Sequence, residues 1–183
     1  MTAITIRAAR PGDARRIARL DVDTWRAAYA GILATPFLVG LSTPRREIGW
    51  AAVIEREPRD VRVAVNSDGE IVGFGSCGRN RDGAEHAGEV FTLYVAPDWQ
   101  NQGIGRALLL ALFERLVAQG ASSALIWVLR DNPSRYFYRR LGGREVRQKN
   151  FVVGGKRIEA AGYAWGDLPR YLETARADGR PEP

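Results

Sequence analysis

Two closely spaced glycines, Gly103 and Gly105, lie where a predicted strand over residues 89–95 gives way to a predicted helix over residues 104–119. The first N–H groups of a helix have no partner inside the helix, and they point outward at the positive end of its dipole. Because glycine has no side chain, a bulky anion can approach the backbone closely at such a position. The segment therefore predicts an anion site suited to a pyrophosphate.

Two other phosphate-binding motifs do not fit this segment. A Walker loop continues with Gly-Lys-Ser/Thr, which residues 100–106 do not contain. A dinucleotide fingerprint needs a third glycine at the position where this chain has Leu108. A glycine pair alone also occurs at a flexible helix start that binds nothing, so the flanking residues have to decide between the alternatives.

The elements that must position this segment alternate between strands and helices. Strands are predicted over residues 3–9, 61–65, 70–77, 89–95 and 124–129, with a final pair flanking the Gly154-Gly155 turn. Helices are predicted over residues 13–30, 44–54, 104–119 and 134–141, the first with Asp13 as its N-cap, and residues 31–43 are predicted as a loop. Neither a repeat nor a linker interrupts this order. It predicts one domain over residues 1–168 and a tail, 169–183, that begins helical and ends disordered.

Composition narrows the class of protein. The 183 residues suffice for one domain with its own core. The formal net charge is +6, but the arginines are scattered, and neither a zinc-finger spacing nor a basic region with heptads accompanies them. This favours an anionic small molecule over nucleic acid as the binding partner. The single cysteine, Cys77, fits a reducing cytoplasm, and no apolar run is long enough to span a membrane. We see no metal-ligand cluster and expect no metal.

Two motifs resemble those of a known family. The strand end Leu93-Tyr94-Val95 followed by Gln100-x-x-Gly103-x-Gly105 closely resembles the acetyl-CoA signature of the GNAT superfamily of N-acetyltransferases. The segment Asn132-Pro-Ser-Arg-Tyr-Phe-Tyr138-Arg-Arg-Leu-Gly142 resembles the region around the family's general-acid tyrosine. The resemblance implies an α+β fold, the GNAT (acyl-CoA N-acyltransferase) fold, with a mixed central sheet of about seven strands, splayed near its middle, and helices on both faces.

The resemblance also implies roles for individual residues. The backbone of the strand end pairs with the pantetheine arm, and an amide near Val95 polarises the thioester carbonyl. Asn132 helps to hold the arm, and Tyr138 protonates the departing thiolate. The implied cofactor-binding residues are Leu93, Tyr94, Val95, Gln100, Asn101, Gln102, Gly103, Ile104, Gly105, Arg106 and Asn132.

Each catalytic role has a structural alternative. Glu89 matches a glutamate that some family members use as a general base, because an alkylammonium with a pKa near ~10.4 must lose a proton before it attacks. Glu89 also fits a solvated charge at a strand end. Asn132 precedes a proline and fits a helix N-cap. Tyr138 fits a packed aromatic, and Tyr136 is a rival acid that points about 200° away on the same helix.

The implied reaction is direct transfer of the acetyl group of acetyl-CoA to a primary amine of a small molecule. Two alternatives remain: a protein N-terminal or lysine acetyltransferase, and a non-catalytic CoA-binding sensor. Nothing in the sequence identifies the acceptor. The expectation is a bacterial cytoplasmic enzyme with no membrane or nucleic-acid partner, and a homodimer is among the expected assemblies.

Overall fold

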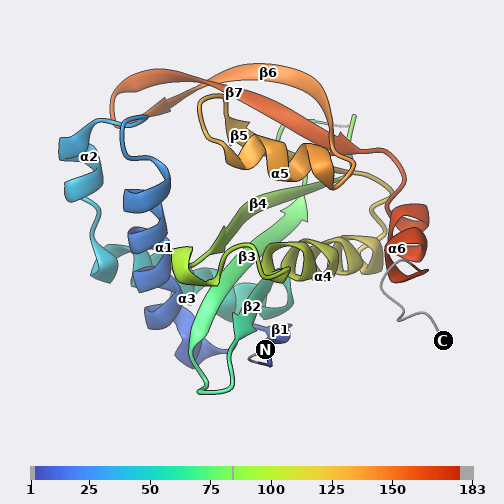
Figure 1. The fold of residues 1–183 in the computed structure, drawn as a ribbon, viewed down its shortest axis with the longest axis horizontal. Helices are drawn as coiled ribbons and strands as arrows, with labels where there is room; N and C mark the ends of the chain where they lie inside the picture. Colours follow the sequence, from blue (N-terminus) through green and yellow to red (C-terminus); the bar gives the residue numbers. More distant parts are fainter. Residues whose placement is uncertain (1–2, 84, 178–183) are drawn as a thin grey trace.

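The computed structural model describes residues 3–83 and 85–177, and its centre is one seven-stranded sheet (Figure 1). The strand order is β1-β2-β3-β4-β5-β7-β6, and only β4 and β5 pair in parallel. The strands are β1 (Thr5–Ala8), β2 (Val61–Val65), β3 (Ile71–Arg79), β4 (Gly88–Val95), β5 (Ala124–Leu129), β6 (Arg144–Val153) and β7 (Lys156–Trp165). The predicted mixed sheet of about seven strands is confirmed.

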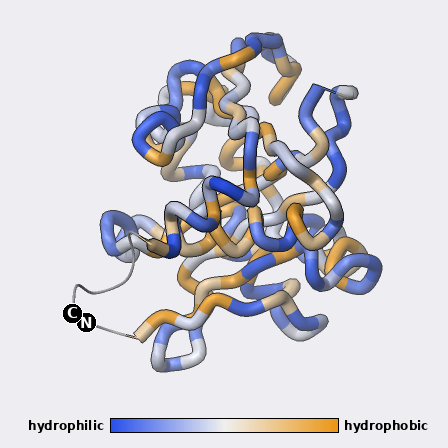
Figure 2. The backbone as a smooth tube through the Cα atoms, turned by 90° about the vertical axis from the view of Figure 1, so that its right-hand side faces the viewer, coloured by the Kyte–Doolittle hydropathy of each residue, from blue (hydrophilic) through white to orange (hydrophobic). Residues whose placement is uncertain are grey.

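Helices cover both faces of this sheet, as the α+β prediction requires (Figure 1). On one face lie α1 (Ala14–Ala28), α2 (Thr35–Val39) and α3 (Thr43–Arg56). On the other face lie α4 (Ile104–Ala118), α5 (Ser134–Arg140) and α6 (Leu168–Ala177). Hydrophobic residues run through the interior strands, and hydrophilic stretches mark the outer turns (Figure 2).

One local prediction is wrong, and a second is right in position but not in mechanism. The segment predicted as a loop over residues 31–43 contains the short helix α2, which places Leu38 in an apolar cluster with Tyr29 and Leu33. Asp13 stands at the N-cap of α1, but its carboxylate does not cap that helix. Instead it accepts a bond from the Arg10 backbone N–H at 2.7 Å and pairs with the Arg7 guanidinium at 2.6 and 3.0 Å.

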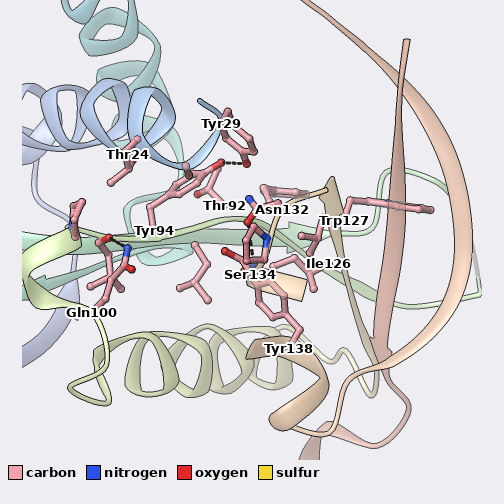
Figure 3. Close-up of a pocket in the computed structure, with 18 residues that line it drawn as sticks. Thr24, Tyr29, Thr92, Tyr94, Gln100, Ile126, Trp127, Asn132, Ser134 and Tyr138 are labelled. Atoms are coloured by element: carbon pink, nitrogen blue, oxygen red, sulfur yellow. Dashed lines mark hydrogen bonds between the residues drawn. The ribbon is translucent and has the colours of Figure 1, made fainter. Parts of the chain in front are cut away.

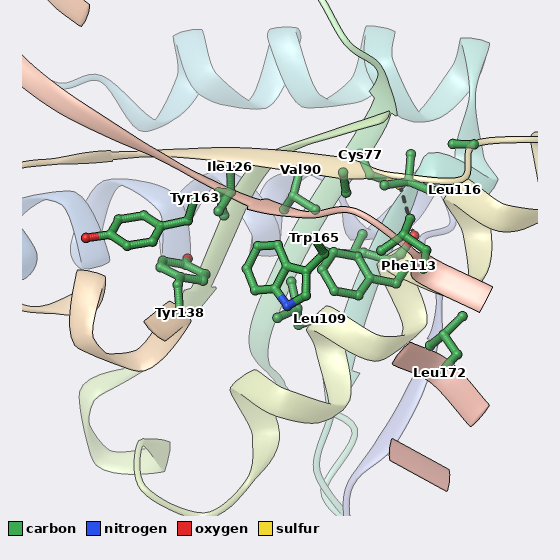
Figure 4. Close-up of a cluster of buried hydrophobic side chains, with 14 of the residues drawn as sticks. Cys77, Val90, Leu109, Phe113, Leu116, Ile126, Tyr138, Tyr163, Trp165 and Leu172 are labelled. Carbon is green, nitrogen blue, oxygen red and sulfur yellow. Dashed lines mark hydrogen bonds between the residues drawn. The ribbon is translucent and has the colours of Figure 1, made fainter. Parts of the chain in front are cut away.

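The main core lies between α4, α5, α6 and the sheet (Figure 4). Phe113 of α4 packs edge-on against Trp165, and Leu172 of α6 is buried in the same cluster, so the packed body continues past residue 168. Residues 178–183 of the predicted tail lie outside the described part of the chain. Cys77 is buried, and burial raises the pKa of its thiol to about 12, which agrees with a packing role.

The sheet parts at its middle. β4 and β5 pair only over Gly88–Val90 and Ala124–Ile126. The register of β4 against β3 jumps from Val90 to Thr92, so Phe91 is left as the extra residue of a bulge. Beyond that bulge, β4 and β5 run on without pairing, and their facing edges are free.

Candidate active site

Two cavities open where β4 and β5 part. The first, which we call the strand cavity, has a volume of about 420 Å³ and lies among the ends of α1, β4 and β5 (Figure 3). The second, the helix cavity, has a volume of about 470 Å³ and lies between the start of α4 and α5. Leu93, Val95, Gln100 and Tyr138 line both cavities. The two cavities are therefore neighbours that share a wall at the gap in the sheet.

The start of α4 forms one wall of the helix cavity. Gly103 is the N-cap and has φ +80°, and Asn101 before it has φ +60°. A Cβ on Gly103 would meet no atom within 4 Å, whereas a Cβ on Gly105 would lie 3.2 Å from the Phe137 ring. Gly103 thus supplies the turn and leaves the backbone open, and Gly105 lets α5 approach. The free N–H groups of this 15-residue helix suit an anion in the cavity.

The other residues predicted around this loop have different surroundings. Gln100 donates from Nε2 to the Val95 carbonyl at 3.0 Å, and Gln102 donates to the Asp98 carbonyl at 3.1 Å. Ile104 is buried in the core beside Leu108. Neither Gln102 nor Ile104 lines either cavity, and the Ile104 side chain is buried while Gln102 is exposed. Arg106 lines the helix cavity and donates to the Ala175 carbonyl, which ties α4 to α6.

The end of β4 presents backbone groups to the gap. The Ala96 N–H bonds to the Val72 carbonyl of β3 at 2.8 Å. Because successive residues of an antiparallel strand point their N–H groups to opposite sides, the Val95 N–H is directed away from β3. The bond from the Gln100 side chain to the Val95 carbonyl agrees with this direction. A donor at Val95 is therefore available to a carbonyl oxygen in the gap, as the sequence predicts.

Tyr138 belongs to both the core and the site. Its side chain packs against Phe137, Tyr163 and Trp165, and its residue is 5% exposed (Figure 4). Burial raises the pKa of the phenol well above its ordinary range, so the hydroxyl keeps its proton at neutral pH. Tyr136 is half exposed, accepts a bond from the Arg135 guanidinium at 2.8 Å, and lines only the helix cavity. The geometry favours Tyr138 as the proton donor.

A pair of tyrosines and an asparagine complete the strand cavity. The hydroxyls of Tyr29 and Tyr94 lie 3.0 Å apart at its wall (Figure 3). Asn132 also lines the cavity, and its Oδ1 accepts a bond from the Ser134 backbone N–H at 2.9 Å, but the N-cap of α5 is Pro133 and not, as the sequence had offered, Asn132. The sequence did not predict the tyrosine pair, because the two residues are far apart in the chain and only the fold brings them together.

Glu89 does not line either cavity. Its residue is 2% exposed, so it is not the solvated charge that the sequence offered as an alternative. The carboxylate accepts bonds from the backbone N–H of Arg81 at 3.1 Å and from its guanidinium at 3.2 and 2.5 Å. The same guanidinium carbon lies 4.3 Å from the ring centroid of Phe91, which does line the strand cavity. Glu89 is thus connected to the cavity wall only through Arg81 and Phe91.

Within residues 3–83 and 85–177, no cluster of three or more histidine, cysteine, aspartate or glutamate side chains could hold a metal ion. In the same part of the chain, no helix combines the length and the apolar character that crossing a membrane requires.

Comparisons with known proteins agree with this geometry. Residues 9–143 match the acetyltransferase (GNAT) family. The chain is 36% identical over 166 residues to the uncharacterized N-acetyltransferase YuaI of Bacillus subtilis (strain 168), a match that covers 90% of this chain and 94% of that protein. The chain therefore belongs to the GNAT family, and it is an N-acetyltransferase by class.

Solved structures show the same fold. The PaiA N-acetyltransferase from Thermoplasma acidophilum, in complex with coenzyme A, has a TM-score of 0.67 at 20% identity over 87% of this chain and 98% of that one. YncA from Salmonella typhimurium, solved with acetyl-CoA, has a TM-score of 0.66 at 22% identity over 91% of this chain and 94% of that one. A shorter match, 37% identical, relates 46% of this chain to 29% of the mycothiol acetyltransferase of Saccharomonospora viridis.

Proposed function

We propose that this protein transfers the acetyl group of acetyl-CoA directly to a primary amine of a small molecule. The observation that carries the proposal is the pair of neighbouring cavities at the gap in the sheet, with Tyr138 on the wall of both. The helix cavity suits the phosphates of the donor, and the strand cavity suits the amine. Direct transfer requires both substrates to be held side by side, and this arrangement provides it.

The residues of the chain divide the work as follows. Backbone N–H groups at Gly103 to Arg106 bind the pyrophosphate, and the free edge of β4 from Leu93 to Val95 binds the pantetheine arm. The Val95 N–H stabilises the carbonyl oxygen as the amine nitrogen bonds to the carbonyl carbon and the carbon–sulfur bond breaks. Tyr138 gives its phenol proton to the departing sulfur, the amine nitrogen loses one proton to water, and the phenolate regains a proton from water.

The contact between the β6–β7 hairpin and α2 supports a small acceptor. The tip of the β6–β7 hairpin reaches over to α2 (Figure 1). A Cβ on Gly154 at that tip would lie 2.7 Å from the Phe37 ring, and Val153 and Ile158 pack in the same cluster as Leu38. This contact places the hairpin tip on α2 in the same apolar cluster as Tyr29, where it would obstruct an extended polypeptide.

The test is release of the CoA thiol from acetyl-CoA in the presence of a panel of small amines and a panel of peptides with free N-termini or lysines. We expect thiol release with small amines and a new acetamide in the product mass. Acetylation of peptides alone would contradict the small-molecule acceptor. Binding of CoA with no acetylation of either panel would identify a sensor instead of an enzyme.

A further inference from the structure

The walls of the strand cavity offer no free negative charge among the residues that the structure describes. The titratable side chains that line it are three tyrosines, Tyr29, Tyr94 and Tyr138. Burial raises the pKa of all three phenols, so they are neutral at neutral pH. A substrate ammonium that entered this cavity would lose its water and gain no opposite charge, and that transfer is strongly unfavourable.

Three carboxylates near these walls have a cation of the protein as a partner. Glu89 is held by Arg81, as described above. Asp82 follows Arg81 in the β3–β4 loop and pairs with the Lys149 ammonium of β6. On the α1 side, Asp21 accepts a bond from Trp50 Nε1 at 3.0 Å and lies 3.4 Å from the Arg46 guanidinium. Each of these three carboxylates has a cation of the chain within 4.0 Å, and the Oδ1 atom of Asp21 is buried without a hydrogen-bond partner among the described residues.

Two of these cations also lie on aromatic walls of the cavity. The Arg81 guanidinium sits over Phe91, and the Lys149 Nζ lies 4.5 Å from the ring centroids of both Trp127 and Phe151. Phe91 and Trp127 line the strand cavity (Figure 3). An aromatic ring attracts a cation through its quadrupole, and here that attraction is used by the protein's own side chains. A substrate cation would therefore find that cations of the protein already lie over these rings.

The Tyr29–Tyr94 hydroxyl pair favours a neutral amine over an ammonium ion. After the bond between the two hydroxyls is made, one hydroxyl hydrogen and several lone pairs remain. A neutral amine can accept a bond from a hydroxyl hydrogen and donate to a hydroxyl oxygen, whereas an ammonium can only donate. The pair can therefore satisfy a neutral amine more completely than an ammonium.

We propose that the acceptor enters the strand cavity as the neutral amine, so that the enzyme selects amines of low basicity over alkylammonium ions. This inference rests on the proposed function and narrows its substrate class. Near pH 7.5, about 0.1% of an alkylamine with a pKa near ~10.4 is neutral, against about a third of an α-amino group with a pKa near ~7.7–8.0. The difference in available substrate is on the order of 10²-fold.

The first test compares ethylamine, 2-fluoroethylamine and 2,2-difluoroethylamine, which differ little in size while each fluorine lowers the basicity. We expect kcat/KM to rise about tenfold per pH unit and to level off at the pKa of each amine, so that the plateau moves to lower pH along the series. If the ammonium is the species that binds and a base of the enzyme takes its proton, kcat/KM will be flat below the pKa of the amine and will fall above it. That pattern would overturn the inference.

Lys149→Gln tests the origin of the preference, because it frees both Asp82 and the rings of Trp127 and Phe151. We expect the ratio of kcat/KM for ethylamine to that for 2,2-difluoroethylamine to rise about 3- to 30-fold at neutral pH. The matched control is Lys156→Gln, since Lys156 is the only other lysine and is exposed at the start of β7. An unchanged ratio in Lys149→Gln would contradict the role of this cation.

Binding without turnover separates this inference from the proposed function. Ethylamine is titrated calorimetrically into the CoA-bound enzyme near pH 7.5 in two buffers with different heats of protonation. Release of about one proton per amine bound supports entry of the neutral form, because nearly all free ethylamine is protonated. Binding without proton release overturns the inference. If ethylamine binds with proton release but no amine is acetylated, the inference stands and the proposed function is overturned. If ethylamine neither binds nor is acetylated, both are overturned.

Discussion

At the scale of single residues, burial determines what Tyr138 can do. A phenol whose pKa is raised by desolvation holds its proton throughout the neutral range, so it is always ready to donate but is a weak acid. The leaving thiolate has a conjugate acid with a pKa near ~8.5 by analogy with cysteine, so it can leave without help. Protonation by Tyr138 should therefore assist the reaction without being indispensable.

Tyr138→Phe keeps the ring and its packing but removes the proton. We expect kcat to fall toward the lower half of the about 10²- to 10⁴-fold range typical of general acids, with little change in the KM for acetyl-CoA. Steady-state kinetics with one amine measure this, and Tyr136→Phe is the control because it lines only the helix cavity. If Tyr136→Phe is the damaging change and Tyr138→Phe is silent, the assignment of the acid is wrong.

Glu89 is bound on both oxygens by Arg81, so its role as a general base stays a prediction from the sequence. If it positions Arg81 over Phe91, Glu89→Gln and Arg81→Gln should lower kcat/KM by similar factors. These factors should be smaller than the about 10²-fold minimum of a general base, and the shape of the pH profile should not change. Recovery of Glu89→Gln alone at high pH would support the general base instead. The measurement is kcat/KM against pH for both variants.

At the scale of elements, the start of α4 should bind the phosphates of CoA through its backbone. Gly103→Ala adds a methyl group at a residue with φ +80° that has no neighbours within 4 Å. We expect CoA affinity to fall about tenfold or more, which corresponds to at least ~1.4 kcal/mol. The left-handed conformation itself costs roughly 1–2 kcal/mol of stability for a residue with a Cβ. Isothermal calorimetry gives the affinity, and thermal unfolding gives the stability.

Gly69→Ala is the matched control for this strain, since Gly69 has φ +79° in the β2–β3 turn and also has no neighbours within 4 Å. It should lower stability to a similar extent and leave CoA binding unchanged. Equal affinity in Gly103→Ala and Gly69→Ala would place the phosphates elsewhere.

The contact between β1 and α1 should make stability depend on pH. Burial opposes the ionisation of Asp13, but its bonds from Arg7 and from the Arg10 N–H outweigh that effect, and its pKa lies below the ordinary value of 3.8. The stability that the ionised carboxylate contributes is present above that ordinary value and is lost as the pH falls through the folded-state pKa.

Asp13→Asn should therefore lower the free energy of unfolding by about 1.5–3 kcal/mol at neutral pH, and the difference from the native chain should shrink below about pH 4. Asp23→Asn is the control, because the Asp23 carboxylate is exposed and pairs loosely with Arg19, at 3.9 Å. This substitution should change the free energy of unfolding by less than ~1 kcal/mol. Denaturant unfolding at several pH values measures both. A difference that is independent of pH would contradict a stabilising role for the ionised Asp13 carboxylate.

At the scale of the whole molecule, the excess of arginine is distributed through ion pairs on many elements. Arg7, Arg46, Arg81, Arg115 and Arg176 each contact a carboxylate, and they belong to different parts of the fold. This distribution fits a protein that holds one anionic cofactor more than one that tracks a nucleic-acid backbone.

We therefore expect duplex DNA to bind weakly and without sequence preference, and to dissociate steeply as salt is raised toward physiological concentration. Fluorescence anisotropy with labelled duplexes, run beside a CoA titration, checks this. Tight and sequence-selective binding at physiological salt would contradict the assignment of the positive charge to the cofactor.

The sequence by itself determined the features that depend on neighbouring residues. The bounds of β2 and β5 agree with those predicted from local patterning, and α4 begins at the predicted residue because Gly103 and Gly105 mark the turn into an apolar helix. Fold class and family also followed from two short motifs. The signals in each case lie within a few residues of one another, where periodicity and backbone geometry act directly.

Only the tertiary structure decided the surroundings of the acceptor. Glu89 pairs with Arg81 across the β3–β4 loop. Tyr29 contacts Tyr94, and Lys149 lies over Trp127, because strands and helices distant in the sequence converge at the gap in the sheet. Whether a carboxylate is free or paired depends on which cation the fold brings within contact, and no local pattern records that. The charge that an amine meets in this cavity is therefore a property of the folded chain and not of any one segment.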